Sequence, residues 1–124
     1  MRFMMIHKAD ANTESMGPPP PELMGALGQL IGEMMAQGKL VSSEGLMPSA
    51  FGARVDVGNG KLEVRDGPFS EAKELIGGYA VIEVADKAEA VEVARRWMQI
   101  HADILGPAYH GSGEVRQLFE RLGA

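Results

Sequence analysis

The chain of 124 residues contains no cysteine. This absence excludes disulfide bonds, a thiolate nucleophile, an iron–sulfur cluster and any zinc site built on cysteine. No apolar run approaches the roughly 18 residues that a membrane-spanning helix needs, so we expect no contact with a membrane. Basic residues are also scarce, because 12 lysines and arginines face 17 aspartates and glutamates for a net charge of −5. Nucleic-acid binding needs clustered cations, and we therefore expect no nucleic-acid partner.

What is present is typical of one globular domain over 1–124, with 45% hydrophobic and 23% charged residues. The apolar run at 3–6 is too short for the core of a signal peptide, so we expect a cytoplasmic location. The three histidines do not have the spacing of metal ligands, and no phosphate-binding or dinucleotide-binding glycine motif occurs. We expect neither a metal nor a cofactor.

The chain is predicted to form two helices and six strands. Apolar residues at spacings of three and four predict a helix over Glu22–Gln37, and Asp86 with Glu89 has the capping-box spacing that opens a second helix. The turn Gly58-Asn59-Gly60 lies between alternating segments and predicts a β-hairpin. Strands are predicted over 2–8, 39–47, 54–57, 61–65, 78–84 and 114–120, with a loop over 106–113.

Without the hairpin, this order of elements is that of a ferredoxin-like βαββαβ sandwich, an α+β fold with two helices on one face of an antiparallel sheet. The first strand and the strand over 78–84 are expected to be central neighbours. Tyr79, Val81 and Glu83 would then point away from the helices, and we expect Phe3 and Met5 to join Val81 on that uncovered face. An apolar face needs a cover, and a second copy of the chain is the simplest one.

Residues 66–74, here called the signature segment, read Asp-Gly-Pro-Phe-Ser-Glu-Ala-Lys-Glu and precede Leu75-Ile76-Gly77-Gly78-Tyr79. They resemble the signature of the DGPF-type branch of the YCII-related family. Further matches lie at Glu44-Gly45-Leu46 with Pro48, and over 114–120. The resemblance covers nearly the whole chain in the same order. It implies a ferredoxin-like fold that dimerises into an α/β barrel, so a homodimer is the expected assembly.

Some YCII-related proteins are similar to enzymes that eliminate chloride from a ring substrate, using a histidine of the first helix and an aspartate. The predicted helix Glu22–Gln37 has no histidine, and the equivalent position near Leu27 is apolar, so the resemblance does not carry that pair over. DGPF-type members are also associated with alternative RNA polymerase sigma factors. Two functions stay open: a small-molecule-binding dimer with weak lyase or isomerase activity, or a non-enzymatic dimeric module in a regulatory or protein-interaction role.

The candidates for acid–base work are His7, Glu44 and Glu83. A carboxylate in a partly apolar cleft has the raised pKa that general acid–base catalysis requires. His7 and Glu83 would form an acid–base pair if both lie on the uncovered face. Ordinary packing is the alternative for His7, and neutralisation by a cation across the dimer is the alternative for the carboxylates.

The signature segment supplies most of the candidate ligand-binding residues. Asp66 either caps the Gly67-Pro68 turn with its side chain or contributes charge to a ligand site. Lys73 binds an anion, acts as an acid or forms a surface salt bridge. The predicted site for a small organic ligand consists of Glu44, Asp66, Phe69, Lys73 and Tyr79.

Overall fold

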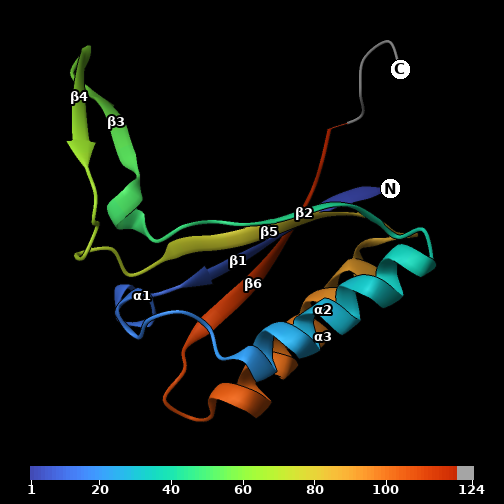
Figure 1. Cartoon of the computed structure of the whole chain (residues 1–124). Coiled ribbons are helices and arrows are strands. Elements are labelled where there is room, and N and C mark those ends of the chain that lie inside the picture. The colour runs from blue at the N-terminus through green and yellow to red at the C-terminus, as the bar shows by residue number, and fades with distance from the viewer. Residues whose placement is uncertain (120–124) are drawn as a thin grey trace.

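The structure is an α+β fold in which two helices cover one face of an antiparallel sheet (Figure 1). The computed structural model describes residues 1–119. Its elements are β1 (Arg2–Ala9), α1 (Ala11–Ser15), α2 (Pro21–Ala36), β2 (Leu40–Gly45), the 3₁₀ turn η1 (Ser49–Phe51), β3 (Ala53–Gly58), β4 (Lys61–Asp66), β5 (Leu75–Glu83), α3 (Lys87–Leu105) and β6 (Gly111–Gln117). The strands of the sheet follow the order β2-β5-β1-β6, and all pairs are antiparallel.

The ferredoxin-like arrangement expected from the sequence is confirmed, with β1 and β5 as central neighbours. β5 begins at Leu75 rather than Gly78, and β6 begins at Gly111, inside the segment predicted as a loop. Glu120, the end of the predicted last strand, lies outside the described residues. The short helix α1 and the turn η1 were not predicted.

The β3–β4 hairpin rises from one end of the sheet, on the side opposite α2 and α3 (Figure 1). Its turn residues Asn59 and Gly60 have φ angles of 53° and 75°, which confirms the turn predicted from the sequence. The capping box is also confirmed at the start of α3, where the Asp86 carboxylate accepts from the Glu89 amide at 2.9 Å and the Glu89 carboxylate accepts from the Ala85 amide at 3.1 Å. No helix within residues 1–119 is long and apolar enough to cross a membrane.

The core lies between the sheet and the two covering helices. Phe3 pairs with Ile82 and Met5 with Ala80, and all four side chains are buried. The expectation that Phe3 and Met5 lie on the uncovered face is therefore wrong, because the register gives them the same side as Ile82. Buried helix residues complete this core: Leu30, Met34, Ala90 and Ala94.

The opposite side of the sheet carries the alternate residues of the same strands. Met4 lies opposite Val81 and Ile6 opposite Tyr79, and all four are only half-buried. Glu83 shares this side, opposite Arg2. The predicted placement of Tyr79, Val81 and Glu83 on the uncovered face is thus confirmed.

Candidate functional site

A groove of about 660 Å³ lies at the root of the hairpin, where η1 and the signature segment meet the ends of β1 and β5. We call it the hairpin-root groove. Its volume falls within the range of small-molecule sites. Its polar lining comes from Lys8, Glu14, Ser49, Arg54 and Glu74. The apolar side chains that line it are Leu46, Met47, Pro48, Phe51, Ala53, Phe69, Leu75 and Ile76.

Phe69 is the anchor of this groove. Only 7% of its surface is exposed, and the Arg54 guanidinium carbon lies 4.0 Å from its ring centroid, in cation–π contact. Arg65 lies farther from the ring, at 5.7 Å, and pairs with Glu71 at 2.7 Å. Arg54, in contrast, has no carboxylate within 4 Å in the described part of the chain. Its charge helps to lower the pKa of Glu71, but no carboxylate in the described part of the chain forms an ion pair with its guanidinium.

Hydrogen bonds around Ser49 hold the groove wall together. The Glu14 carboxylate accepts from the Ser49 amide and from the Ser49 hydroxyl, each at 2.6 Å. The Ser49 hydroxyl in turn accepts from the Phe69 amide at 3.1 Å. A Cβ atom on Gly67 would overlap the Ser49 carbonyl oxygen, so the close approach of the two segments requires glycine. These contacts connect α1, η1 and the signature segment.

Lys8 carries the second positive charge of the groove, but this charge is already neutralised. Its ammonium lies 2.8 Å from the Glu114 carboxylate and 3.6 Å from that of Glu74. The hydrogen bond to Glu114 raises the pKa of Lys8, and the hydrogen bond from Lys8 lowers the pKa of Glu114. Both groups therefore stay charged near pH 7.

Of the predicted ligand-binding residues, only Phe69 lines the groove. Glu44 and Tyr79 lie opposite each other on the uncovered face, on β2 and β5. Asp66 and Lys73 are exposed on the signature segment. The capping bond expected from the Asp66 side chain is not found within residues 1–119, nor is an ion pair of Lys73.

The predicted pairing of His7 with Glu83 is wrong. Glu83 lies on the uncovered face, 3.6 Å from the N-terminal ammonium. His7 lies opposite Gly78 and alternates along β1 with the same side as Phe3 and Met5. Its ring therefore points to the helix-covered side. The sheet separates the two side chains, which therefore cannot exchange a proton directly.

His7 instead joins a cluster of rings between the sheet and α3. Its Nε2 atom lies 2.6 Å from the Tyr109 hydroxyl, and its ring centroid lies 4.5 Å from that of His101. Tyr109 and His101 are stacked at 5.5 Å, and Trp97 lies 5.8 Å from His101. Sequence reasoning missed this cluster because 102 positions separate His7 from Tyr109, and only the pairing of β1 with β6 brings them together.

Burial makes this cluster uncharged at neutral pH. It lowers the pKa of His7 to about 4, with a further contribution from His101, and it lowers the pKa of His101 itself. Burial, with the nearby Asp10 carboxylate, raises the pKa of Tyr109. His101 Nδ1 lies 2.8 Å from the Trp97 carbonyl. Because a carbonyl only accepts, the proton of His101 is on Nδ1.

Comparison with known proteins identifies the family. The model of the YCII-related domain matches residues 1–105, which include the hairpin and the signature segment. No curated protein matches the chain. Since the match covers most of the sequence, the chain belongs to the YCII-related domain family.

Proposed function

We propose that this chain binds a small organic anion in the hairpin-root groove. The observation that carries the proposal is the Arg54 guanidinium, which lies on the Phe69 ring without a carboxylate partner in residues 1–119. A guanidinium presents a planar fork of N–H donors that matches a carboxylate or a phosphate. The contact with the Phe69 ring, 4.0 Å from the guanidinium carbon, restricts the Arg54 side chain, so less side-chain entropy is lost when an anion binds.

The remaining lining favours a ligand with a compact apolar body. Leu46, Met47 and Phe51 offer apolar surface on the hairpin side of the groove. The two carboxylates of the lining already have partners, since Glu14 accepts from Ser49 and Glu74 lies 3.6 Å from the Lys8 ammonium. A monocarboxylate on a single ring fits both the volume and the charge of the groove.

The test compares benzoate with its uncharged analogue benzamide in thermal unfolding. We expect benzoate to raise the melting temperature of the wild type and benzamide to leave it unchanged. Arg54→Gln should weaken benzoate binding by about tenfold, as the loss of a charge-assisted hydrogen bond does. Arg65→Gln is the matched control, because Arg65 also faces Phe69 but is paired with Glu71. Equal benzoate binding by wild type and Arg54→Gln would overturn the proposal.

We also propose that the chain belongs to the DGPF-type branch of the family. The signature segment supports this assignment, because two of its positions, 67 and 69, lie in surroundings that few other residue types would fit. Gly67 lies against the Ser49 backbone without room for a Cβ atom, and Phe69 is the buried ring beneath Arg54. In this proposal, the signature builds the groove rather than supplying a catalytic group.

We further propose that a second copy of the chain covers the uncovered face and completes a dimeric α/β barrel. Met4, Ile6 and Val81 form an apolar strip there that is only half-buried. Charged residues lie at both ends of the strip, with Arg2 and Glu83 at one end. An apolar centre with a polar rim is typical of an interface between subunits.

Val81→Asp tests the dimer. The substitution puts an unpaired charge into the proposed interface, which costs several kcal/mol of association free energy. We expect sedimentation to show a wild-type dimer and a monomeric variant, while Val91→Asp, on the outer side of α3, stays dimeric. A wild-type particle of 13.3 kDa at high micromolar concentration would contradict the dimer.

Weak lyase or isomerase chemistry is the second part of the small-molecule proposal, and Glu44 is its acid–base group. Glu44 lies on the uncovered face, two positions before Leu46 of the groove lining. Of the three catalytic candidates, His7 is on the other side of the sheet and Glu83 pairs with the N-terminus. Glu44→Gln should therefore retain benzoate binding but lose any turnover found with a ring carboxylate.

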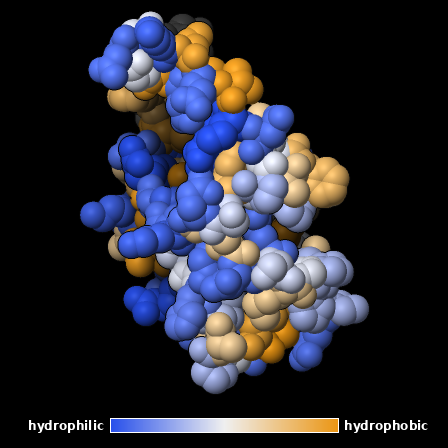
Figure 2. Space-filling view, turned by 90° about the vertical axis from the view of Figure 1, so that its left-hand side faces the viewer, coloured by the Kyte–Doolittle hydropathy of each residue, from blue (hydrophilic) through white to orange (hydrophobic). Residues whose placement is uncertain are grey.

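One observation favours the rival function, a non-enzymatic module in a regulatory, sigma-factor-associated or protein-interaction role. The hairpin carries an apolar stripe whose exposed fractions range from 64% to 74%, made of Val55, Val57, Leu62 and Val64. In the space-filling view of this end of the molecule, hydrophobic surface lies on one side of the hairpin at the top, beside hydrophilic surface on its other side (Figure 2). The rival predicts that no small molecule stabilises the chain, so the benzoate experiment separates the two functions.

A further inference from the structure

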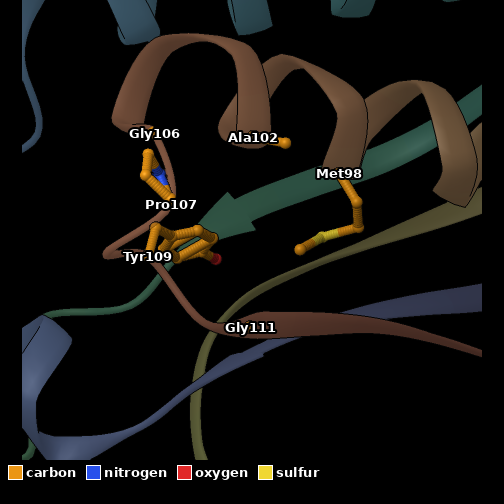
Figure 3. Close-up of a pocket in the computed structure, with 6 residues that line it drawn as sticks. All are labelled: Met98, Ala102, Gly106, Pro107, Tyr109 and Gly111. Carbon is orange, nitrogen blue, oxygen red and sulfur yellow. The ribbon is translucent and has the colours of Figure 1, made fainter.

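A second cavity, of about 390 Å³, lies on the helix-covered side of the sheet, between the end of α3 and the start of β6 (Figure 3). We call it the Tyr109 cavity. The side chains of Tyr109 and Met98 point into it from opposite sides (Figure 3). Ala102, Gly106, Pro107 and Gly111 form the rest of its lining, so no charged side chain of residues 1–119 lines it.

The Tyr109 hydroxyl is the polar group of this cavity, and its position is fixed. His7 Nε2 lies 2.6 Å from the hydroxyl oxygen, and the tyrosine ring stacks on His101. A Cβ atom on Gly111 would overlap this hydroxyl. Glycine at 111 therefore leaves the space that the hydroxyl occupies. A polar group held in place from several sides is pre-organised for hydrogen bonding to a ligand.

The groups around the cavity favour an uncharged ligand. His7 and His101 are neutral near pH 7 because burial lowers the pKa of each, and Tyr109 keeps its proton because burial and Asp10 raise its pKa. The Asp10 carboxylate is engaged with Thr13, from which it accepts at 2.9 Å. The buried indole N–H of Trp97, in the same cluster, has no hydrogen-bond partner within residues 1–119. Such a donor marks a site that warrants a functional explanation.

We infer that the Tyr109 cavity binds a small uncharged organic molecule with one hydrogen-bonding group, which pairs with the Tyr109 hydroxyl. An alcohol or a phenol meets this description, because its hydroxyl can either donate or accept, whichever role the His7 contact leaves to Tyr109. A charged ligand would lose its hydration without gaining a counter-charge from the lining. This site goes beyond the proposed anion site, which lies at the hairpin root and uses Arg54.

Trp97 is the chain's single tryptophan and lies 5.8 Å from His101, on which Tyr109 stacks, so we expect its fluorescence to respond to binding in the cavity. The probes are benzyl alcohol and ethylbenzene, which have similar shapes and differ in the hydroxyl group. We expect both to change Trp97 fluorescence saturably in the millimolar range. Tyr109→Phe should weaken benzyl alcohol binding by about fivefold, the size of one hydrogen bond, and leave ethylbenzene binding unchanged.

Tyr79→Phe is the matched control, since it makes the same change at the only other tyrosine, on the opposite face of the sheet. It should leave both affinities unchanged. Ala102→Leu fills the cavity without altering Tyr109 and should abolish binding of both probes, which keeps the test decisive if Tyr109→Phe folds poorly. The inference is overturned by the absence of saturable binding to the wild type, by an equal effect of Tyr109→Phe on both probes, or by unchanged binding in Ala102→Leu.

Discussion

The two hollows of this molecule lie on opposite sides of one sheet and differ in charge. The lining of the hairpin-root groove includes Arg54, Lys8 and two carboxylates, whereas the Tyr109 cavity is lined by a tyrosine hydroxyl and by no charged side chain of the described residues. Both have volumes that suit a small molecule. The difference shows that volume alone does not decide the class of ligand, because the lining charges determine which ligand can give up its hydration.

This difference has a structural origin. The groove is formed mainly by connections, namely the segments on either side of the hairpin, where long polar side chains reach solvent. The Tyr109 cavity lies under an amphipathic helix, whose sheet-facing side carries Ala94 and His101. Burial there lowers the pKa of both histidines and keeps them uncharged, whereas the groove at the hairpin root is lined by charged side chains.

The largest effect is expected from Phe69→Ala, which removes the buried anchor of the groove. Deleting a buried aromatic ring costs roughly 3 kcal/mol of unfolding free energy. Phe51→Ala is the matched control, because Phe51 lines the same groove but is 73% exposed, and its effect should stay within about 0.5 kcal/mol. Denaturant unfolding measures both. Equal losses would mean that Phe69 does not anchor the groove.

Acid should destabilise the Tyr109 side of the molecule. The pKa of His7 is about 4 in the folded protein, against 6.5 for an unperturbed histidine, so the unfolded chain takes up this proton first as the pH falls. The part of the unfolding free energy that depends on neutral His7 is fully present above pH 6.5 and is lost as the pH falls from 6.5 to about 4. It amounts to roughly 3 kcal/mol. His7→Gln should flatten this part of the curve of stability against pH, and an unchanged curve would contradict the buried placement of His7.

A smaller effect is expected when the groove wall loses a charged acceptor. Glu14→Gln keeps the shape of the side chain but weakens the two 2.6 Å bonds to Ser49, which should cost about 1 kcal/mol of unfolding free energy. Glu63→Gln is the control, because Glu63 is exposed on β4 without a side-chain hydrogen bond in the described residues. In thermal unfolding, the melting temperature of Glu14→Gln should be clearly lower than that of Glu63→Gln.

The smallest effects concern Asp66 and Lys73 of the signature segment. Neither side chain has a hydrogen-bond partner in the described range, so Asp66→Ala and Lys73→Met should each change the unfolding free energy by less than about 0.5 kcal/mol. A loss of about 1 kcal/mol in Asp66→Ala that Asp66→Asn restores would instead support the capping role expected from the sequence.

Most of the helices and strands were predictable from the sequence because their signals are local. The positive φ angles at Asn59 and Gly60 and the cap at Asp86 depend on residues next to one another, and both were confirmed. The side of β1 was predicted wrongly for a related reason. Both faces of this strand are apolar, with Phe3 and Met5 on one side and Met4 on the other, so alternation alone could not distinguish them.

The candidate sites depended on contacts between distant segments, and most were not predictable. Phe69 was identified through the signature segment, but Arg54 was not, because its contact with Phe69 depends on how the hairpin folds back on its root. His7 was singled out as a candidate acid–base group, and the face and partner expected for it were wrong. Its true neighbour, Tyr109, is placed by the pairing of β1 with β6 and by the space at Gly111.

The most direct test of the central claim is to observe the Arg54 side chain while benzoate is added. In nitrogen-15 NMR spectra, the Arg54 Nε–H signal, assigned by its loss in Arg54→Gln, should shift saturably with benzoate and not with benzamide. The signal of Arg95, paired with Glu92 on α3, should not move. An Arg54 signal that stays in place, or that moves equally with both compounds, would contradict an anion site at the hairpin root.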